Sequence, residues 1–300
     1  MFPRKIYDLP LPEAGALRLG ERTLIMGILN VTPDSFADGG RFFEPARAAA
    51  AVCRMEQDGA DIIDIGGEST RPGAGVLTAE QELERVLPVI RSVAGRVHVP
   101  LSIDTYKAEV ARVALTEGVS IVNDVSGLRY DPSLAGIVAA AGAPLVLMHT
   151  RGRSRDMYRE AVYRDVAVEI TREIEDSISA AVAAGVSRDR IIIDPGIGFG
   201  KRPEHSYQAL AALPVLAALD RPMLIGPSRK SFLQAALGEC LPDARKWGTA
   251  AAVAAGVLYG AHIVRVHDVP EMVDVVRVAD RIRAVASAQW PVVSHETDRR

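Results

Sequence analysis

Eight short apolar runs rich in β-branched residues alternate with longer stretches of helical periodicity along this 300-residue chain. Consecutive positions within each run are apolar, which is typical of parallel strands whose outer faces are covered by helices. The predicted strands are Thr23–Val31, Ile62–Gly66, Pro100–Thr105, Ile121–Val125, Leu145–Thr150, Ile191–Gly196, Pro222–Ser228 and Ile263–Asp268. The pattern therefore predicts an α/β fold built from eight strand–helix units.

Glycine punctuates the passage from helix to strand at four of these units. Gly59, Gly118, Gly142 and Gly260 each end a helical stretch, and a strand begins within three residues. Glycine adopts the left-handed conformation that stops a helix without steric cost. Eight such units predict a single (β/α)8 TIM barrel over residues 23–287, after an N-terminal lead-in (1–22) and before a C-terminal tail (288–300). A doubly wound open sheet is the alternative, but no GxGxxG follows the first strand.

Composition and charge narrow the function classes. The chain is 48% hydrophobic and 24% charged, with a net charge of −3, so we expect a globular protein without general affinity for nucleic acid or anionic membranes. No run suits an export signal or a membrane span. Cys53 and Cys240 lie far apart outside any CxxC pair, so we expect reduced thiols and a cytoplasmic protein.

Polar residues gather where the predicted strands end. In a barrel of this kind the carboxyl ends of all strands share one mouth. A single strand-end carboxylate can simply cap the following helix, but a repeated set indicates a functional site. The set comprises Asn30, Glu68 to Arg71, Asp104, Asn123, Asp124, His149, Asp194, Ser228 to Ser231, Arg265 and His267.

The chemistry of these groups suggests a heterocyclic, anionic substrate. Acceptors and donors on Asp104, Asn123, Asp194 and Lys230 match the edges of a flat heterocycle. Arg265 can stack on the ring face. Met148 can cover the other face, although a methionine at a strand end is more often part of the core.

The cationic groups at the last two strands indicate an anion and a metal. Lys230, Arg265 and His267 can converge on one polyanionic group. Asn30 is the expected metal ligand, through its side-chain oxygen, for Mg²⁺ held mainly by substrate phosphates and water. A turn role for Asn30 remains an alternative.

One glycine-rich segment imitates a phosphate loop. In Gly196-Ile197-Gly198-Phe199-Gly200-Lys201, Pro195 stands where the first Walker glycine belongs, and Arg202 stands where Ser or Thr should follow. The segment is therefore not a P-loop. No GxSxG or HExxH occurs either, and no lysine stands alone in an apolar strand as a Schiff-base nucleophile would. Covalent catalysis is therefore not indicated.

Five multi-residue motifs follow one another through essentially the whole predicted barrel. They are Met26-Gly27-Ile28-Leu29-Asn30-Val31-Thr32-Pro33-Asp34-Ser35-Phe36, Gly66-Gly67-Glu68-Ser69-Thr70-Arg71-Pro72-Gly73, Asp194 to Lys201, Ser228-Arg229-Lys230-Ser231-Phe232 and Arg265-Val266-His267-Asp268-Val269. This set resembles the motifs of bacterial dihydropteroate synthases, the pterin-binding TIM-barrel enzymes. The resemblance implies a sulfonamide-target transferase of folate biosynthesis. Its reaction would join 6-hydroxymethyl-7,8-dihydropterin diphosphate to 4-aminobenzoate and release pyrophosphate.

The resemblance also implies residue roles. Arg71, Lys230, Arg265 and His267 would be catalytic. The pterin would be bound by Asp104, Asn123, Met148, Asp194, Gly226, Lys230 and Arg265. The diphosphate would be bound by Asn30, Arg71, Arg265 and His267, with Asn30 holding Mg²⁺. The aminobenzoate would be bound by Thr70, Arg71, Pro72, Phe199 and Ser231. The family is usually homodimeric, through helices away from the mouth.

The segment after His149 differs from the usual sequence of the family. After Met148-His149 the family often has Gly, a small residue and Pro, whereas this chain reads Thr150-Arg151-Gly152-Arg153-Ser154-Arg155. The three arginines are expected to form a solvated loop.

A pterin-dependent corrinoid methyltransferase would share the barrel and the Asp/Asn/Asp set but would not need the diphosphate clamp. A non-catalytic pterin-binding paralogue would be expected to have lost Lys230 or the Thr70-Arg71-Pro72 segment.

Overall fold

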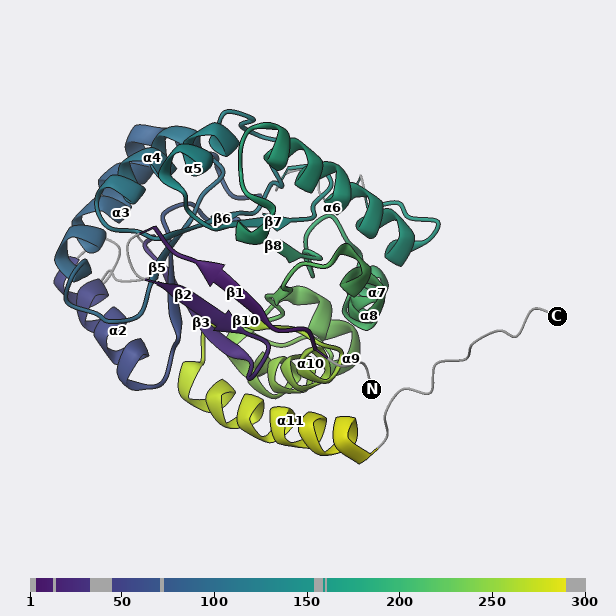
Figure 1. Cartoon of the computed structure of the whole chain (residues 1–300). Coiled ribbons are helices and arrows are strands. Elements are labelled where there is room, and N and C mark those ends of the chain that lie inside the picture. Colours follow the sequence, from purple (N-terminus) through teal and green to yellow (C-terminus); the bar gives the residue numbers. More distant parts are fainter. Residues whose placement is uncertain are drawn as a thin grey trace.

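Eight parallel strands form a barrel that is ringed by helices (Figure 1). The computed structural model describes residues 4–12, 15–32, 45–70, 73–153, 159 and 161–289. The strands follow the order β8-β7-β6-β5-β4-β3-β10-β9, and a parallel bridge between Ile193 and Met223 joins β8 to β9. Their bounds are β3 Leu24–Asn30, β4 Ile62–Gly66, β5 Leu101–Asp104, β6 Ile121–Asp124, β7 Leu145–Met148, β8 Ile191–Asp194, β9 Leu224–Ile225 and β10 Ile263–Val266. The predicted TIM barrel is confirmed, although most predicted strands extend beyond the observed ends.

The helices form the outer layer of the barrel. The α-helices are α2 Pro45–Gln57, α3 Ala79–Val93, α4 Ala108–Thr116, α5 Leu134–Ala141, α6 Val166–Ala183, α7 Pro203–Ala211, α8 Leu213–Leu216, α9 Gln234–Leu237, α10 Lys246–Leu258 and α11 Val269–Gln289. Short 3₁₀ turns are η1 Arg188–Arg190, η2 Ala217–Leu219, η3 Ser231–Leu233 and η4 Pro242–Arg245. Gly59, Gly118, Gly142 and Gly260 all have positive φ, from 59° to 103°, which confirms their role as helix stops.

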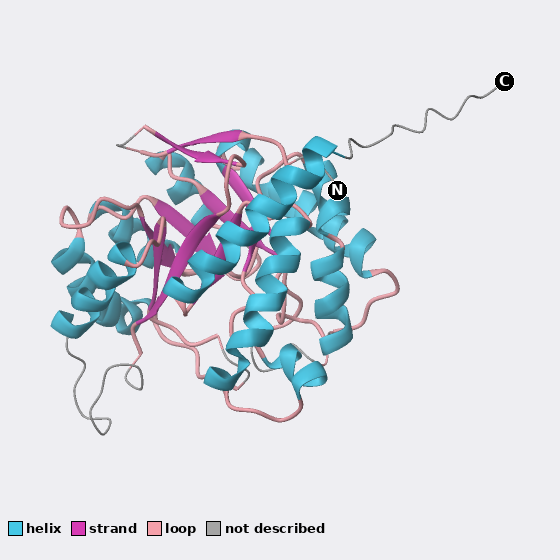
Figure 2. Cartoon of the chain, turned by 90° about the horizontal axis from the view of Figure 1, so that it is seen from below, coloured by secondary structure: helices cyan, strands magenta, loops and turns pink. Residues whose placement is uncertain are grey.

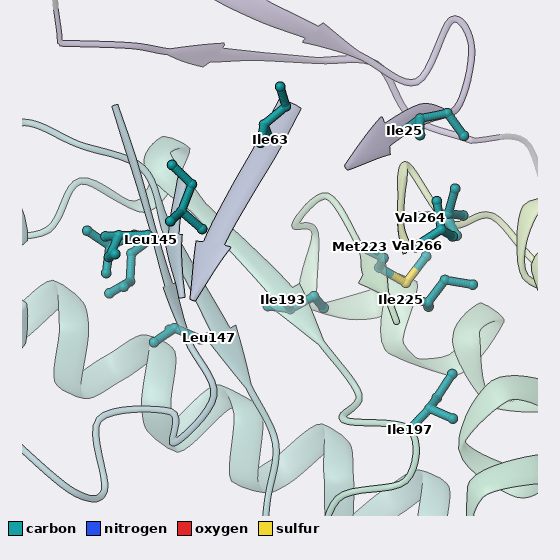
Figure 3. Packing of buried hydrophobic residues seen from close by; sticks show 14 of the residues in the cluster. Ile25, Ile63, Leu145, Leu147, Ile193, Ile197, Met223, Ile225, Val264 and Val266 are labelled. Carbon is teal, nitrogen blue, oxygen red and sulfur yellow. The ribbon is translucent and has the colours of Figure 1, made fainter. Parts of the chain in front are cut away.

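Strand residues divide between two cores because successive side chains point to opposite faces. The outward residues pack against the helices, and Figure 3 shows Ile63, Leu147, Ile193 and Val264 among them. The inward residues form a second, smaller core inside the barrel. That inner core includes Met26, Ile62, Ile121, Val146, Ile192, Leu224 and Ile263.

An antiparallel hairpin closes the end of the barrel at which the strands begin. It consists of β1 (Tyr7–Pro10) and β2 (Ala16–Leu19), and both figures place it across the barrel (Figures 1 and 2). Leu9 and Leu19 are fully buried and join the inner core. Arg4 fastens the segment through a hydrogen bond of 2.7 Å to the Ala261 carbonyl and a 3.1 Å ion pair with Asp280. The barrel therefore opens at its other end.

The cysteines and the helix lengths bear on the expectations drawn from composition. Cys53 and Cys240 are free thiols. Among the helices of the described residues, none is long and apolar enough to cross a membrane.

Candidate active site

The inner face of the barrel changes from apolar to polar toward the carboxyl ends of the strands. The strand register places Ile28 beside Asp64, Asp64 beside Ser102, and Asp104 beside Asn123. These positions continue the inward alternation of the apolar inner core. Asn30, Met148, Asp194, Gly226 and Arg265 fall on the same alternation in their own strands or just beyond them. The predicted site residues from seven strands therefore converge on one end of the barrel interior.

A network of ionic hydrogen bonds centred on Arg265 forms the floor of this site. Arg265 Nε donates to Asp64 Oδ2 and an Arg265 terminal nitrogen donates to Asp104 Oδ2, each at 2.6 Å. Asn123 Nδ2 donates to the same Asp64 oxygen at 2.9 Å. Asp64 is fully buried and Asn123 is 3% exposed. Charge-assisted bonds of this kind are short and strong, so the network fixes the plane of the guanidinium and the orientation of the amide.

Asp194 and Lys230 form a second charged group beside this network. Asp194 Oδ1 accepts a 2.7 Å hydrogen bond from the Gly196 amide. Lys230 Nζ donates to the Ile197 carbonyl and lies 4.2 Å from the centre of the Phe199 ring. Loop residues that follow β8 and β9 thus meet at the mouth, where Phe199, the predicted aminobenzoate contact, lies next to the Lys230 ammonium.

Burial perturbs the titration of these groups. Loss of solvent raises the pKa of Asp104 to about 7, an effect that the Arg265 charge opposes. Burial likewise lowers the pKa of Lys230 to about 7, against the attraction of Asp194. Burial also raises the pKa of Asp194. Several titratable groups with strongly shifted pKa values in one cluster are typical of functional sites.

The remaining predicted residues surround the cluster or fall outside the described chain. His267 Nδ1 lies 2.9 Å from Ser228 Oγ, one residue beyond the end of β10. Met148 is 4% exposed. Gly226 is buried, and a β-carbon at this position would lie 3.8 Å from Arg265 Cβ and 3.9 Å from Lys230 Nζ. Ser231 begins η3 and is exposed, and Thr70 is partly buried. Arg71 and Pro72 lie outside the described residues, as do Asp34 and Ser35.

Some strand-end residues have a structural partner instead. Asp124 points outward and accepts hydrogen bonds from the amides of Ser126 (2.7 Å) and Leu128 (2.6 Å), so it caps the turn after β6 and not the following helix, α5. Glu68 accepts bonds from Tyr106 Oη at 3.0 Å and Lys107 Nζ at 2.5 Å, so it anchors the start of the loop that carries Thr70.

The expectation of a solvated loop after His149 is wrong for Arg151. Its guanidinium pairs with Glu169 (2.7 Å) and Glu173 and stacks 4.0 Å from the Tyr163 ring centre. Glu169 and Glu173 lie on α6, so the partners of Arg151 come from a helix that follows it in the sequence. Arg153 stacks on Tyr130 at 4.5 Å. Arg151 and Arg153 are thus held by neighbouring side chains, whereas Arg155 lies outside the described residues.

Two site residues were missed by the sequence analysis. Asp64 was read as part of an apolar strand, although a carboxylate at an inward position was a usable signal. Lys201, at the end of the false phosphate loop, is 1% exposed. Its Nζ lies 2.8 Å from His149 Nδ1 and donates to the Phe199 carbonyl at 3.1 Å. Lys201 therefore holds the backbone that carries Phe199.

The described residues contain no group of three or more His, Cys, Asp or Glu side chains able to hold a metal ion. Asn30 ends β3 at the mouth, paired in register with Gly66. The protein thus offers an amide oxygen there instead of a complete set of ligands. This arrangement suits a hard cation whose other ligands come from a phosphorylated substrate and water.

Comparisons with known proteins agree with this geometry. The sequence profile of the pterin binding enzymes matches residues 26–267. A dihydropteroate synthase from a Synechocystis species is 44% identical over 277 residues, covering 92% of this chain and 96% of that protein. The Escherichia coli dihydropteroate synthase is 41% identical, covering 85% of this chain and 90% of the relative.

Solved structures give the same result. The Yersinia pestis dihydropteroate synthase in complex with a sulfonamide drug superposes with a TM-score of 0.86 at 40% identity, covering 92% of this chain and 99% of that one. The Xanthomonas albilineans dihydropteroate synthase in complex with 7,8-dihydropteroate superposes with a TM-score of 0.79 at 41% identity, covering 88% and 94%.

Fold, polar barrel mouth and profile together define a pterin-binding enzyme of the TIM-barrel class. Within that class, the identity to several relatives over most of both chains is decisive. The chain belongs to the dihydropteroate synthase family, the transferases of folate biosynthesis, and the corrinoid methyltransferase and non-catalytic alternatives are set aside.

Proposed function

We propose that the mouth of the barrel binds 6-hydroxymethyl-7,8-dihydropterin diphosphate and 4-aminobenzoate and joins them with release of pyrophosphate. The observation that carries the proposal is the buried network of Asp64, Arg265, Asp104 and Asn123 beside Asp194 and Lys230. A purely structural network would sit equally well among apolar neighbours, but this one faces the open end of the barrel.

Pterin recognition rests on Asp104, Asn123, Asp194 and Lys230. Each Asp carboxylate accepts hydrogen bonds from ring or amino N–H groups, and the amide and the ammonium complete the donor and acceptor pattern of the ring edge. Asp194 retains acceptor capacity because the Gly196 amide occupies only one site on one of its oxygens. Arg265, fixed by two carboxylates, presents its flat guanidinium to the ring face. Gly226 admits the ring closely because it has no side chain, and Met148 covers the opposite face.

The leaving group is held by Arg265 and His267, together with Arg71 from the second loop. Positive charge at these positions stabilises the pyrophosphate as the bond to the pterin methylene carbon breaks. Mg²⁺ held by Asn30 would neutralise further charge on the departing diphosphate. The aniline nitrogen of 4-aminobenzoate then bonds to the methylene carbon and loses a proton. Because the aniline is weakly basic and unprotonated at neutral pH, little general-base help is needed.

The aminobenzoate lies at the outer part of the mouth. Phe199 and Pro72 contact its ring, and Ser231, Thr70 and Arg71 bind its carboxylate. Support comes from the position of Phe199, whose backbone is held by Lys201 and whose ring lies against Lys230. The amine is thereby directed at the carbon next to the pterin ring.

Product formation from both substrates with Mg²⁺ present tests the proposed reaction. A His267→Ala variant tests the division between clamp and ring site. We expect its affinity for the diphosphate substrate to fall much more than its affinity for the free hydroxymethyl pterin, because only the first ligand carries the anionic group. Equal weakening of both ligands in calorimetry would contradict the clamp.

Two expectations about the surroundings of the enzyme are also proposals. We infer a homodimer through helices away from the mouth. In support, Val278, Ile282 and Val285 expose apolar side chains one helical turn apart on α11. Sedimentation velocity tests the dimer. A cytoplasmic location fits the two free thiols.

A further inference from the structure

Arg229 has an unusual backbone conformation between two residues of the mouth. Its φ is 58°, in the left-handed region that glycine adopts readily and a residue with a long side chain seldom does. Ser228 precedes it and Lys230 follows it. Such a conformation persists only when the surroundings fix it, and it is concentrated at functional sites.

The surroundings of Arg229 hold its backbone on both sides. The Arg229 amide donates to Thr249 Oγ1 at 3.0 Å, and its carbonyl accepts from an Arg245 terminal nitrogen at 2.9 Å. Thr249 is fully buried and Arg245 is 8% exposed, so both partners are rigidly placed on or next to α10. The left-handed turn at Arg229 is therefore imposed by the fold.

The side chain of Arg229 makes a two-point ion pair with Asp268. Nε donates to Asp268 Oδ2 at 3.1 Å and a terminal nitrogen donates to Oδ1 at 2.6 Å. Asp268 is 8% exposed, and although its burial opposes ionisation, Arg229 lowers its pKa. The second carboxylate on Arg229, that of Asp243, is exposed and contributes little. Asp268 is thus the partner that matters.

This ion pair lies next to a second contact between the same two segments. Ser228 Oγ accepts a 3.2 Å bond from the His267 amide and lies 2.9 Å from Nδ1 of the same ring. Residues 228 and 229 of one loop are thereby joined to residues 267 and 268 of the other. Since Lys230 follows directly, a shift of the ion pair displaces both Lys230 and His267.

We propose that Arg229 and Asp268 form a positioning pair that fixes Lys230 and His267 relative to each other without touching substrate. The proposal rests on the proposed roles of Lys230 at the pterin and His267 at the diphosphate. Its consequence is that the pair sets the distance between the ring site and the clamp, so that both ends of the diphosphate substrate are bound at once.

The test uses Asp268→Asn and Arg229→Gly in the full-length enzyme. Asp268→Asn keeps the shape of the side chain but removes its charge. Arg229→Gly removes the guanidinium and adopts the left-handed turn without strain, so it should fold. We expect each single variant to bind the diphosphate substrate about tenfold more weakly than the parent. Because the two residues act as one pair, the double variant should bind this substrate no more weakly than the weaker-binding single variant. Affinity of Asp268→Asn for free hydroxymethyl pterin should change less than threefold.

Controls separate this proposal from a loss of stability and from the proposed function itself. The exposed ion pair between Arg91 and Glu117 (2.6 Å) is the matched control, and Glu117→Gln should leave both affinities unchanged. If Arg229→Gly and Asp268→Asn bind the diphosphate substrate within twofold of the parent while His267→Ala binds it weakly, the positioning role is wrong and the proposed function stands. If His267→Ala has no effect either, the clamp is wrong, and the positioning role falls with it.

Discussion

Replacing Asp64 separates the structural and electrostatic contributions of the buried network. Asp64 is fully buried, and one of its oxygens accepts bonds from both Arg265 and Asn123. Asp64→Ala removes that oxygen, leaving Arg265 with Asp104 and the Asn123 amide without its acceptor. Asp64→Asn keeps an oxygen in the same place and loses only the charge.

The expected loss of stability differs between the two variants. Breaking a buried ion pair by removing one partner costs about 3–5 kcal/mol, because the other group stays buried without compensation. For Asp64→Ala we expect a loss near the lower limit of that range, since Arg265 keeps Asp104 at 2.6 Å. For a chain of 300 residues, about 3 kcal/mol corresponds to a fall in Tm of roughly 5 °C. For Asp64→Asn we expect about 1 kcal/mol, because both donors keep an acceptor.

The Asn variant also has an electrostatic signature. The Asp64 carboxylate raises the pKa of Asp104, in addition to the larger effect of burial. Asp64→Asn should therefore move the pKa of Asp104 below its parent value of about 7. Thermal unfolding of both variants, with an NMR titration of the Asp104 carboxyl, measures both effects. A fall in Tm below 2 °C for Asp64→Ala, or equal falls for both variants, would refute the reasoning.

Four further predictions address other parts of the molecule. Asp194→Asn should lower pterin affinity about 10–100-fold in calorimetry with Tm nearly unchanged, because it turns a donor toward ligand N–H groups; unchanged affinity would remove Asp194 from the site. The raised pKa of Asp104 means that the folded state keeps this proton between about pH 4 and 7, where the unfolded chain has lost it. Rising pH should therefore destabilise the parent relative to Asp104→Asn by roughly 1 kcal/mol per pH unit in urea titrations, and parallel pH curves would contradict the shift. Lys201→Met should raise KM for 4-aminobenzoate several-fold in steady-state kinetics, because the Phe199 carbonyl loses its donor; a lower Tm with an unchanged KM would contradict this prediction. Leu9→Ala should cost about 2–5 kcal/mol of unfolding free energy while KM stays constant, since Leu9 packs inside the closed end of the barrel; a changed KM would mean that the hairpin affects the mouth.

The fold could be predicted from the sequence because its signals are local. Apolar runs and glycine stops report on adjacent residues, and they located all eight barrel strands. The hairpin formed by β1 and β2 was not foreseen. Its strands are four residues each, and they present few apolar side chains to the barrel. Such short elements are stable through the inner core they cover, which the local pattern does not contain.

The candidate site was only partly predictable for a related reason. Asp104, Asn123, Asp194 and Arg265 stand at strand ends, so position alone brought them together. Asp64 lies inside β4 and not at its end, two residues before Gly66, and it is flanked by two isoleucines. The local pattern therefore makes it part of an apolar strand. The partners of Arg151 and Lys201 come from α6 and from the neighbouring strand end, so they depend on tertiary packing that no local pattern records.

The closure of the barrel between β8 and β9 has a consequence for how ligands act on the enzyme. Among the described residues, β8 and β9 are paired only by the bridge between Ile193 and Met223. The strand pairs β6–β7 and β7–β8 share longer ladders. Asp194 ends β8, and Lys230, which follows β9, donates to the carbonyl of Ile197 in the loop after β8. A pterin bound by both Asp194 and Lys230 would therefore connect β8 to β9 at the place where the barrel has its shortest strand pairing. Amide protons along β8 and β9 should then exchange with solvent fastest in the empty enzyme and slow most when the pterin is bound.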